Sequence, residues 1–151
     1  MGHCISAQGV ATEPSKVTAV QQWPTPTNLK TLRGFLGLTG YYRKFIKNYG
    51  LISRSLTLLL KKGAPFQWTA VTEEAFSLLK DALVKAPVLA IPDFTKPFVL
   101  ETDACDLGLG VVLMQDGHPI AYLSKPLLIS VNHLANKTRH CQYMKRSAWP
   151  S

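Results

Sequence analysis

The sequence predicts an α+β fold, with helices in the first part of the chain and strands in the second. Apolar residues recur at helical spacing in several segments between residues 14 and 86. From residue 98 to residue 124 the pattern changes to short apolar strands separated by glycine-containing turns. A linker bounded by prolines separates the two patterns, so we place a domain boundary near Pro92.

The composition indicates a folded chain with an anionic partner. Hydrophobic residues make up 46% of the 151 residues, enough for the core of one domain or of two small pieces of larger ones. Basic residues outnumber acidic ones by 17 to 9, and no acidic residue occurs between Lys16 and Lys62. The three cysteines lack the paired spacing of a zinc site or a disulfide framework. No apolar run reaches the roughly 20 residues that span a bilayer. We therefore expect an intracellular protein, cytoplasmic or nuclear, without a membrane partner.

Turn and capping residues delimit the first elements. Residues 3–10 are typical of a hairpin, with Gln8 and Gly9 as its turn. Pro14 fits the first turn of a short helix that runs to about Gln22, because proline lacks an N–H that this position does not need. Two closely spaced prolines follow and exclude further helix.

A longer helix is expected from Thr27 or Asn28, either of which can cap it, to about Ile46. On a helical wheel its apolar residues gather on one side, and basic residues and glycines gather on the other. Glycines let a phosphate backbone approach closely, while long cationic side chains reach around it. The same pattern also fits a solvated face whose glycines allow close helix packing, and the wheel does not decide between the two. The candidate nucleic-acid contacts are Lys30, Arg33, Gly34, Gly37, Tyr41, Arg43 and Lys44.

Two further helices complete the first part of the chain. One is expected over residues 51–62, where a glycine and a proline then end it. The other opens at Thr72, followed by acidic residues that suit the positive end of the helix dipole. Phe76, Leu79 and Leu83 form its predicted buried stripe.

One aspartate lies where a divalent metal is often held in proteins. Asp103 belongs to an apolar strand after the linker, and Gly108 and Gly110 predict a turn into the next strand. Asp116 and Gly117 predict a second turn. A carboxylate at the end of a buried strand can coordinate a metal, but a single carboxylate does not support metal catalysis.

Several motifs occur in an order that resembles a known family. They are WPTP at residues 23–26, LRGFLGLTGYYRKFI at 32–46, FQW at 66–68, FVLETDA at 98–104 and HPIAYLSK at 118–125. Together they resemble the Pol polyprotein of gypsy-class LTR retrotransposons, and the resemblance covers roughly residues 2–126.

The resemblance implies a division of the chain. Residues 1–13 correspond to the last palm hairpin of a reverse transcriptase, and residues 14–91 to its thumb and connection helices. Residues 92–127 correspond to a truncated RNase H-like domain with an incomplete mixed sheet. Asp103 takes the position of the first catalytic aspartate, for which the family cofactor is Mg²⁺. Cys105 stands where the family usually has serine. The implied partner is an RNA–DNA hybrid or a DNA duplex.

The other carboxylates that this chemistry requires are missing. No Tyr-x-Asp-Asp motif occurs in the sequence, so we expect no polymerase activity. RNase H chemistry uses two divalent ions about 4 Å apart, held by about four acidic groups. No aspartate or glutamate follows Asp116. Strand alternation places Glu101 on the side of Asp103, and we interpret Glu101 and Asp106 as solvated loop or edge charges. We expect Asp103 to bind one Mg²⁺ weakly, without catalysis.

Residues 128–151 are interpreted as an out-of-frame translation of the RNase H helix. Read two bases on, the codons of Met144 and Lys145 give glutamate without ambiguity, and neighbouring codons permit the His-Glu-Lys-Glu motif of the family. The histidines and the cysteine of this segment match no common zinc spacing. An intact frame through Ser151 at the genomic locus, without a downstream pol remnant, would contradict the interpretation.

Three functions remain open on the sequence. The first is a catalytically inactive Pol fragment that binds RNA–DNA duplex non-specifically through the thumb. The second is an RNase H-type nuclease subunit completed by a partner chain. The third is a host-recruited interaction module that uses an apolar sheet edge. We also expect an exposed sheet edge after Leu123, which would promote aggregation.

Overall fold

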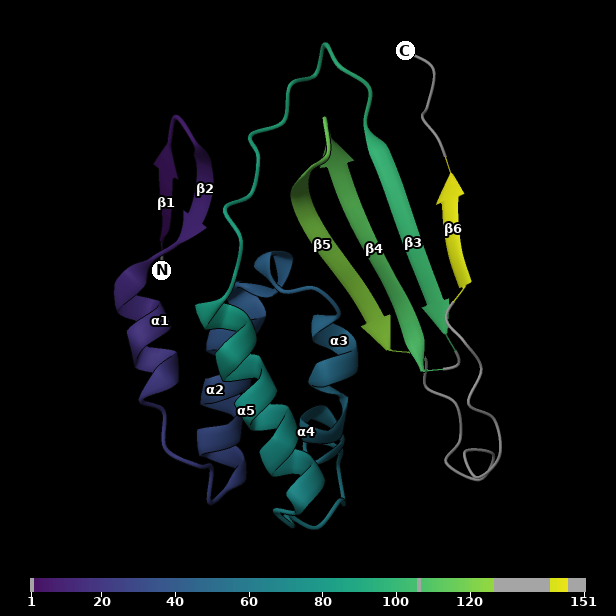
Figure 1. The fold of residues 1–151 in the computed structure, drawn as a ribbon. Helices are drawn as coiled ribbons and strands as arrows, with labels where there is room; N and C mark the ends of the chain where they lie inside the picture. The colour runs from purple at the N-terminus through teal and green to yellow at the C-terminus, as the bar shows by residue number, and fades with distance from the viewer. Residues whose placement is uncertain (1, 106, 127–141, 147–151) are drawn as a thin grey trace.

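The structure is a computed structural model that describes residues 2–105, 107–126 and 142–146. The helices pack beside a four-stranded sheet, and the N-terminal hairpin and first helix lie on the side away from that sheet (Figure 1). The expected α+β fold is confirmed. The described elements are β1 (His3–Ser6), β2 (Gly9–Thr12), α1 (Pro14–Gln21), α2 (Leu29–Tyr41), the 3-10 helix η1 (Arg43–Phe45), α3 (Tyr49–Ile52), α4 (Arg54–Leu58), α5 (Ala70–Val84), β3 (Val99–Cys105), β4 (Gly108–Gln115), β5 (His118–Pro126) and β6 (Gln142–Arg146).

The turn of the N-terminal hairpin lies one residue before the expected position. Ala7 and Gln8 form it, and Gly9 already belongs to β2. Gly9 has a φ of 136°, and a Cβ at this position would overlap the carbonyl oxygen of Leu89. The backbone of β2 exchanges two hydrogen bonds of 2.8 Å with Leu89. Both its positive φ and the close approach of the chain after α5 therefore require glycine at position 9.

Helix α2 begins where the sequence indicates and ends earlier than expected. The Asn28 side chain caps it by accepting a 3.0 Å hydrogen bond from the backbone N–H of the third helical residue. The helix ends at Tyr41, and the chain continues as η1 instead of as α-helix to Ile46. Residues three apart lie on the same side of a 3-10 helix, so Tyr42 and Phe45 both enter the core.

The helix expected over residues 51–62 is instead two short helices, α3 and α4, which meet at the buried Ser53. Helix α3 begins directly after Asn48, which adopts the left-handed conformation with a φ of 58°. The start of α3 lies in a segment, Asn48 to Leu51, that contacts the sheet, and helical periodicity does not reveal such contacts.

Helix α5 begins two residues before the expected position and buries the expected stripe. Thr69 is its cap, and the Thr69 and Thr72 side chains form a reciprocal capping box. Thr72 is thus the third helical residue and not the first. Phe76, Leu79 and Leu83 are at most 2% exposed, which confirms their assignment to the core.

The main core of the described part lies among the helices. Its buried hydrophobic residues are Val20, Leu32, Phe35, Leu36, Tyr42, Phe45, Ile46, Leu56, Ala75, Phe76, Leu79, Leu83 and Leu89. Each large apolar side chain buried in this way contributes about 1.5–3 kcal/mol. From the larger sheet, Tyr122 packs partly buried against this core. Within the described ranges, no helix is long and apolar enough to cross a membrane.

The larger sheet has the strand order β5-β4-β3-β6, and all its described pairings are antiparallel. A mixed sheet requires a parallel pair, and the described strands contain none. Strand β5 lies at one edge of this order, and Leu123 on it is 57% exposed. The predicted out-of-frame tail lies outside the described residues except for β6, for which the structure describes the backbone pairing with β3.

One of the two predicted turns in the sheet is confirmed. Asp116 and Gly117 both have positive φ, of 50° and 78°, and form the two-residue turn between β4 and β5. Gly108 and Gly110, in contrast, lie within β4 and not in a turn. The connection from β3 to β4 lies at residues 106–107, of which residue 106 lies outside the described part. The two glycines of β4 therefore need another explanation.

Candidate functional site

One face of the sheet carries Asp103 and is turned toward the helices. In the antiparallel register Asp103 lies opposite Gly110 of β4, and Gly110 lies opposite Ser124 of β5. In the same way, Glu101 lies opposite Val112 of β4, and Val112 lies opposite Tyr122 of β5. Residues opposite one another, and residues two apart on one strand, share a face of a sheet. Glu101 and Asp103 therefore lie on the same side, as expected.

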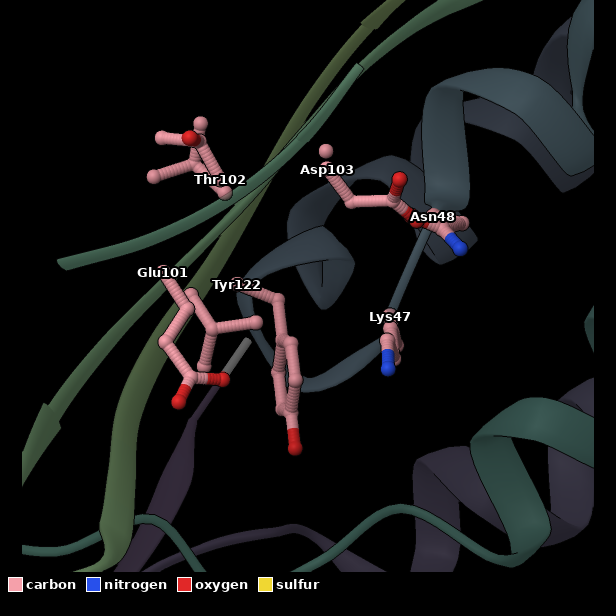
Figure 2. A pocket seen from close by; sticks show the side chains of 9 residues that line it. Lys47, Asn48, Glu101, Thr102, Asp103 and Tyr122 are labelled. Carbon is pink, nitrogen blue, oxygen red and sulfur yellow. The ribbon is translucent and has the colours of Figure 1, made fainter. Parts of the chain in front are cut away.

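The chain around Asn48 lies on this face. The Asp103 carboxylate and the Asn48 side chain point toward one another, with Lys47 beside them (Figure 2). A Cβ at Gly110 would stand 2.5 Å from Oδ1 of Asn48, so this amide lies directly on the β4 backbone. The arrangement explains the glycine at position 110: it allows close approach between two segments far apart in the sequence.

The Asp103 carboxylate lines a small cavity. Its Oδ1 is buried and forms no hydrogen bond with the described residues. The cavity has a volume of about 20 Å³, and Lys47, Asn48, Glu101 and Tyr122 contribute to its lining. A buried carboxylate oxygen without a partner is compatible with a metal ligand.

The donor set around Asp103 does not fit a two-ion centre. Among the described residues, no three histidine, cysteine, aspartate or glutamate side chains are grouped so that they could hold a metal ion. Glu101 shares the cavity with Asp103, but a two-metal site takes about four acidic groups. Asp106, the remaining nearby carboxylate, lies outside the described residues. The described part of the chain thus supplies two of the required carboxylates at most.

The candidate nucleic-acid contacts on α2 are exposed, as the wheel predicts. Lys30, Arg33, Gly34 and Gly37 all lie on the exposed side of the helix. A Cβ at Gly34 would stand 3.1 Å from Cζ2 of Trp23, so Gly34 serves the packing of that ring. A Cβ at Gly37 would have no atom within 4 Å. The packing explanation therefore applies to Gly34 and not to Gly37, and the nucleic-acid contact of this face stays a prediction.

Tyr41 and Lys44 lie next to the N-terminal hairpin. The Tyr41 ring stacks on His3 with centroids 5.2 Å apart, and Phe45 also contacts the imidazole at 5.5 Å. Lys44 Nζ lies 5.3 Å from the centroid of the Phe45 ring. Burial lowers the pKa of His3, and the positive charge of Lys44 acts in the same direction. This cluster extends the α2 face to the residues that resemble the palm hairpin.

Arg43 lies apart from the other candidate contacts. It belongs to η1 and lines a hollow of about 290 Å³ at the sheet, together with Tyr122, Ser124 and Lys125. Arg43 and Lys125 are both exposed, and no described ion pair neutralises either of them. Sequence reasoning missed Lys125, because the wheel compares residues of one helix and Lys125 comes from a distant strand.

Sequence reasoning also missed Asn48 as a neighbour of Asp103. Asparagine is one of the few residues other than glycine that adopt the left-handed conformation readily, so the residue type could have indicated a chain reversal before α3. Its position over Gly110 depends on the docking of helices on the sheet, for which the sequence carries no local signal.

Comparison with known proteins gives consistent results. Residues 68–143, half of the chain, match the model of the RNase H-like domain found in reverse transcriptase. The chain is 47% identical over 128 residues to the retrovirus-related Pol polyprotein from transposon 297 of Drosophila melanogaster, covering 84% of this chain and 12% of that protein. It is 39% identical over 139 residues to the Pol polyprotein from transposon gypsy of the same organism, covering 84% and 13%.

A solved structure resembles most of the fold. The foamy viral protease-reverse transcriptase in complex with RNA/DNA hybrid matches with a TM-score of 0.74 and 26% identity, over 84% of this chain and 18% of that one. The chain thus spans about an eighth of the length of the two curated relatives. The family match begins before α5 and ends at residue 143. Neither end coincides with the boundaries expected near Pro92 and residue 128, so these two boundaries stay predictions.

Proposed function

The chain belongs to the family of RNase H-like domains found in reverse transcriptase and represents a segment of a gypsy-class retrotransposon Pol polyprotein, and from this premise we propose that it binds a nucleic-acid duplex without cleaving it. The family activity is that of a reverse transcriptase and RNase H. The proposal assigns to these residues the contact with the duplex and not the chemistry. It applies to an RNA–DNA hybrid or a DNA duplex, since the non-specific term in duplex binding depends on phosphate charge.

The exposed face of α2 carries the proposal. Gly37 lies inside a helix, where glycine costs about 1 kcal/mol relative to alanine, and no described atom needs the space that a Cβ would take. Lys30 and Arg33 lie two turns and one turn before it on the same exposed side, and among the described residues no carboxylate forms an ion pair with them. A helix face that combines two unpaired cations with a glycine whose space no described atom fills is suited to close contact with a phosphate backbone.

The solved neighbour supports the choice of partner. The foamy viral protein of similar fold was solved in complex with an RNA/DNA hybrid. The net charge of +8 on this chain favours an anionic partner of the same kind.

The lack of cleavage follows from the donor set. Asp103 and Glu101 are the carboxylates that line the cavity, and the sequence has no aspartate or glutamate after Asp116. Mg²⁺, which the family uses in pairs to activate water and stabilise the leaving oxygen, would find too few ligands among them. We therefore expect no hydrolysis of a hybrid by this chain.

Charge reversal on α2 tests the binding. Fluorescence anisotropy of a labelled hybrid, measured across a salt series, compares the unmodified chain with Lys30→Glu/Arg33→Glu. The control is Lys61→Glu/Lys62→Glu, which makes the same change of charge at two exposed positions outside α2. We expect the α2 variant alone to lose affinity strongly, and its slope of log affinity against log salt to fall by about 2, since each phosphate contact contributes about 0.9. Equal losses in both variants, or no binding by the unmodified chain, would refute the proposal.

A second candidate function is favoured by the unpartnered oxygen of Asp103. If a partner chain supplied the missing carboxylates, the pair could act as an RNase H-type nuclease. Mg²⁺-dependent cleavage of a hybrid after addition of Pol segments, abolished by Asp103→Asn, would support this candidate. Absence of cleavage with such segments present would remove it.

A further inference from the structure

We propose that residues 47–51 form a fixed cover on the Asp103 face of the sheet, which withholds Asp103 from metal and nucleic acid even when other carboxylates are supplied. Such a cover would limit access to Asp103 independently of how many metal ligands the chain supplies. It would therefore also act against an RNase H-type nuclease completed by a partner chain.

The first contact of the cover joins Asn48 to β4. Asn48 adopts the left-handed conformation with a φ of 58°, which turns the chain onto the sheet. Its Oδ1 occupies the space into which a Cβ at Gly110 would project, at 2.5 Å. A side chain at position 110 would require the Asn48 amide to move off the β4 backbone. Since Gly110 lies directly opposite Asp103 in the register, Asn48 covers the position next to the aspartate.

The second contact joins Gly50 to β5. The Gly50 N–H donates a hydrogen bond of 2.6 Å to Ser124 Oγ. A Cβ at Gly50 would stand 2.9 Å from Cδ of Pro126 and 3.1 Å from Ser124 Oγ, so a larger residue does not fit. Ser124 lies opposite Gly110, and the two contacts are therefore adjacent on one face.

The third contact joins Leu51 to the start of β4. Cδ2 of Leu51 lies where a Cβ at Gly108 would stand. Glycines at positions 50, 108 and 110, from two distant segments, thus all face the same contact, and a Cβ at any of them would come closer than 3.0 Å to an atom of the opposite segment. These contacts explain the two glycines of β4, for which the sequence predicts a turn.

The space that remains next to Asp103 is too small for a hydrated magnesium ion. The cavity of about 20 Å³ holds about one water molecule. Mg²⁺ keeps several waters when one or two carboxylates bind it. The Lys47 side chain also lies at this cavity, where its positive charge opposes a second cation (Figure 2). The small space beside the aspartate and the charge of Lys47 therefore both oppose a metal ion at Asp103.

Thiol accessibility tests the cover in the full chain. Asp103→Cys is introduced after Cys4, Cys105 and Cys141 are replaced by serine, and its rate of labelling by a soluble thiol reagent is measured. The matched control is Ala104→Cys in the same background, because Ala104 is exposed and lies on the opposite face of β3. We expect Ala104→Cys to react about tenfold faster or more, since position 103 is only partly exposed and its outer atoms point under Asn48, whereas position 104 is exposed. Equal rates overturn the proposal.

A second variant identifies what covers the aspartate. Asn48→Gly removes the amide but retains a residue that tolerates the positive φ, so the chain is expected to fold, and a cooperative thermal transition checks this. We expect it to accelerate labelling of Asp103→Cys and to leave Ala104→Cys unchanged. If labelling of Asp103→Cys stays slow in the folded Asn48→Gly chain, the Asn48 side chain is not the cover and the proposal fails.

Metal binding gives an independent readout that needs no catalysis. Mn²⁺ is titrated into the unmodified chain and into Asp103→Asn, and binding is followed by electron paramagnetic resonance. We expect the two chains to bind Mn²⁺ equally, because Asp103 does not contribute a site. A Mn²⁺ site present in the unmodified chain and lost in Asp103→Asn overturns the cover. Duplex binding through α2 is measured separately, so either proposal can fail without the other.

Discussion

Replacing Gly37 by alanine separates the binding role of the α2 glycines from their structural role. Gly37 is exposed within the 13-residue helix, and a Cβ there would meet no atom within 4 Å. Gly34 lies one turn earlier on the same helix, and a Cβ there would stand 3.1 Å from Cζ2 of Trp23. Gly37→Ala is therefore the test, and Gly34→Ala is the matched comparison.

The structure gives opposite expectations for the stability of the two variants. Alanine inside a helix is more stable than glycine by about 0.5–1 kcal/mol. Nothing opposes the new methyl group at Gly37, so we expect that gain in full, or a rise in Tm of about 2 °C or more for a chain of this size. At Gly34 the Trp23 ring must move by a few tenths of an ångström, and overpacking of about 1 kcal/mol cancels the gain.

Thermal unfolding and duplex binding are measured on the same preparations, by circular dichroism and by fluorescence anisotropy. If the phosphate backbone approaches α2 at Gly37, the methyl group holds it away. A loss of roughly 1 kcal/mol of contact would weaken binding about fivefold. The expected signature of Gly37→Ala is thus higher stability together with weaker binding.

Two results would refute this reasoning. A Gly37→Ala chain that is more stable and binds the duplex as tightly as the unmodified chain would show that no backbone approaches at Gly37. A Gly37→Ala chain that is less stable would show that the space beside Gly37 is filled, contrary to the structure.

Three further predictions concern stability and the second basic site. Lys80→Met removes hydrogen bonds from Nζ to carbonyls at the end of α1, including one of 2.5 Å to Trp23, and we expect a loss of about 1–2 kcal/mol in urea unfolding. Burial lowers the pKa of His3 below its ordinary 6.5, so the unfolded state binds more protons than the folded state. The free energy of unfolding should therefore be fully present above pH 6.5 and fall as the pH drops through the folded-state pKa. Thermal melts across pH should show this dependence in the unmodified chain and its loss in His3→Phe. Arg43→Glu with Lys125→Glu should weaken duplex binding and lower its salt dependence, because both side chains line one hollow; an unchanged salt slope would exclude a phosphate there.

Elements that depend on neighbouring residues could be predicted from the sequence. The Asn28 cap, the helix start at Pro14 and the turn at Asp116 and Gly117 are confirmed. Each depends on groups within a few positions along the chain, because capping and tight turns are local. The assignment of Asp103 to a strand depended on alternation and motif in the same local way.

Elements whose boundaries are set by distant contacts could not be predicted. Gly108 and Gly110 were assigned to a turn because glycine is a turn signal, whereas the structure uses them where Leu51 and Asn48 pack on the sheet. The segment expected as one helix over residues 51–62 forms α3 and α4, and the residues at the start of α3 are those that contact the sheet.

The sequence by itself determined the family of this chain, the strand position of Asp103 and the lack of carboxylates after Asp116. Only the tertiary structure decided that Gly34 packs on a ring while Gly37 faces open space, and that Asn48 lies over the face of Asp103. The physical reason is that a glycine or a carboxylate acts through the atoms within a few ångströms of it. Those atoms come from segments that the packing of helices on the sheet brings together, and the order of residues along the chain does not specify them locally.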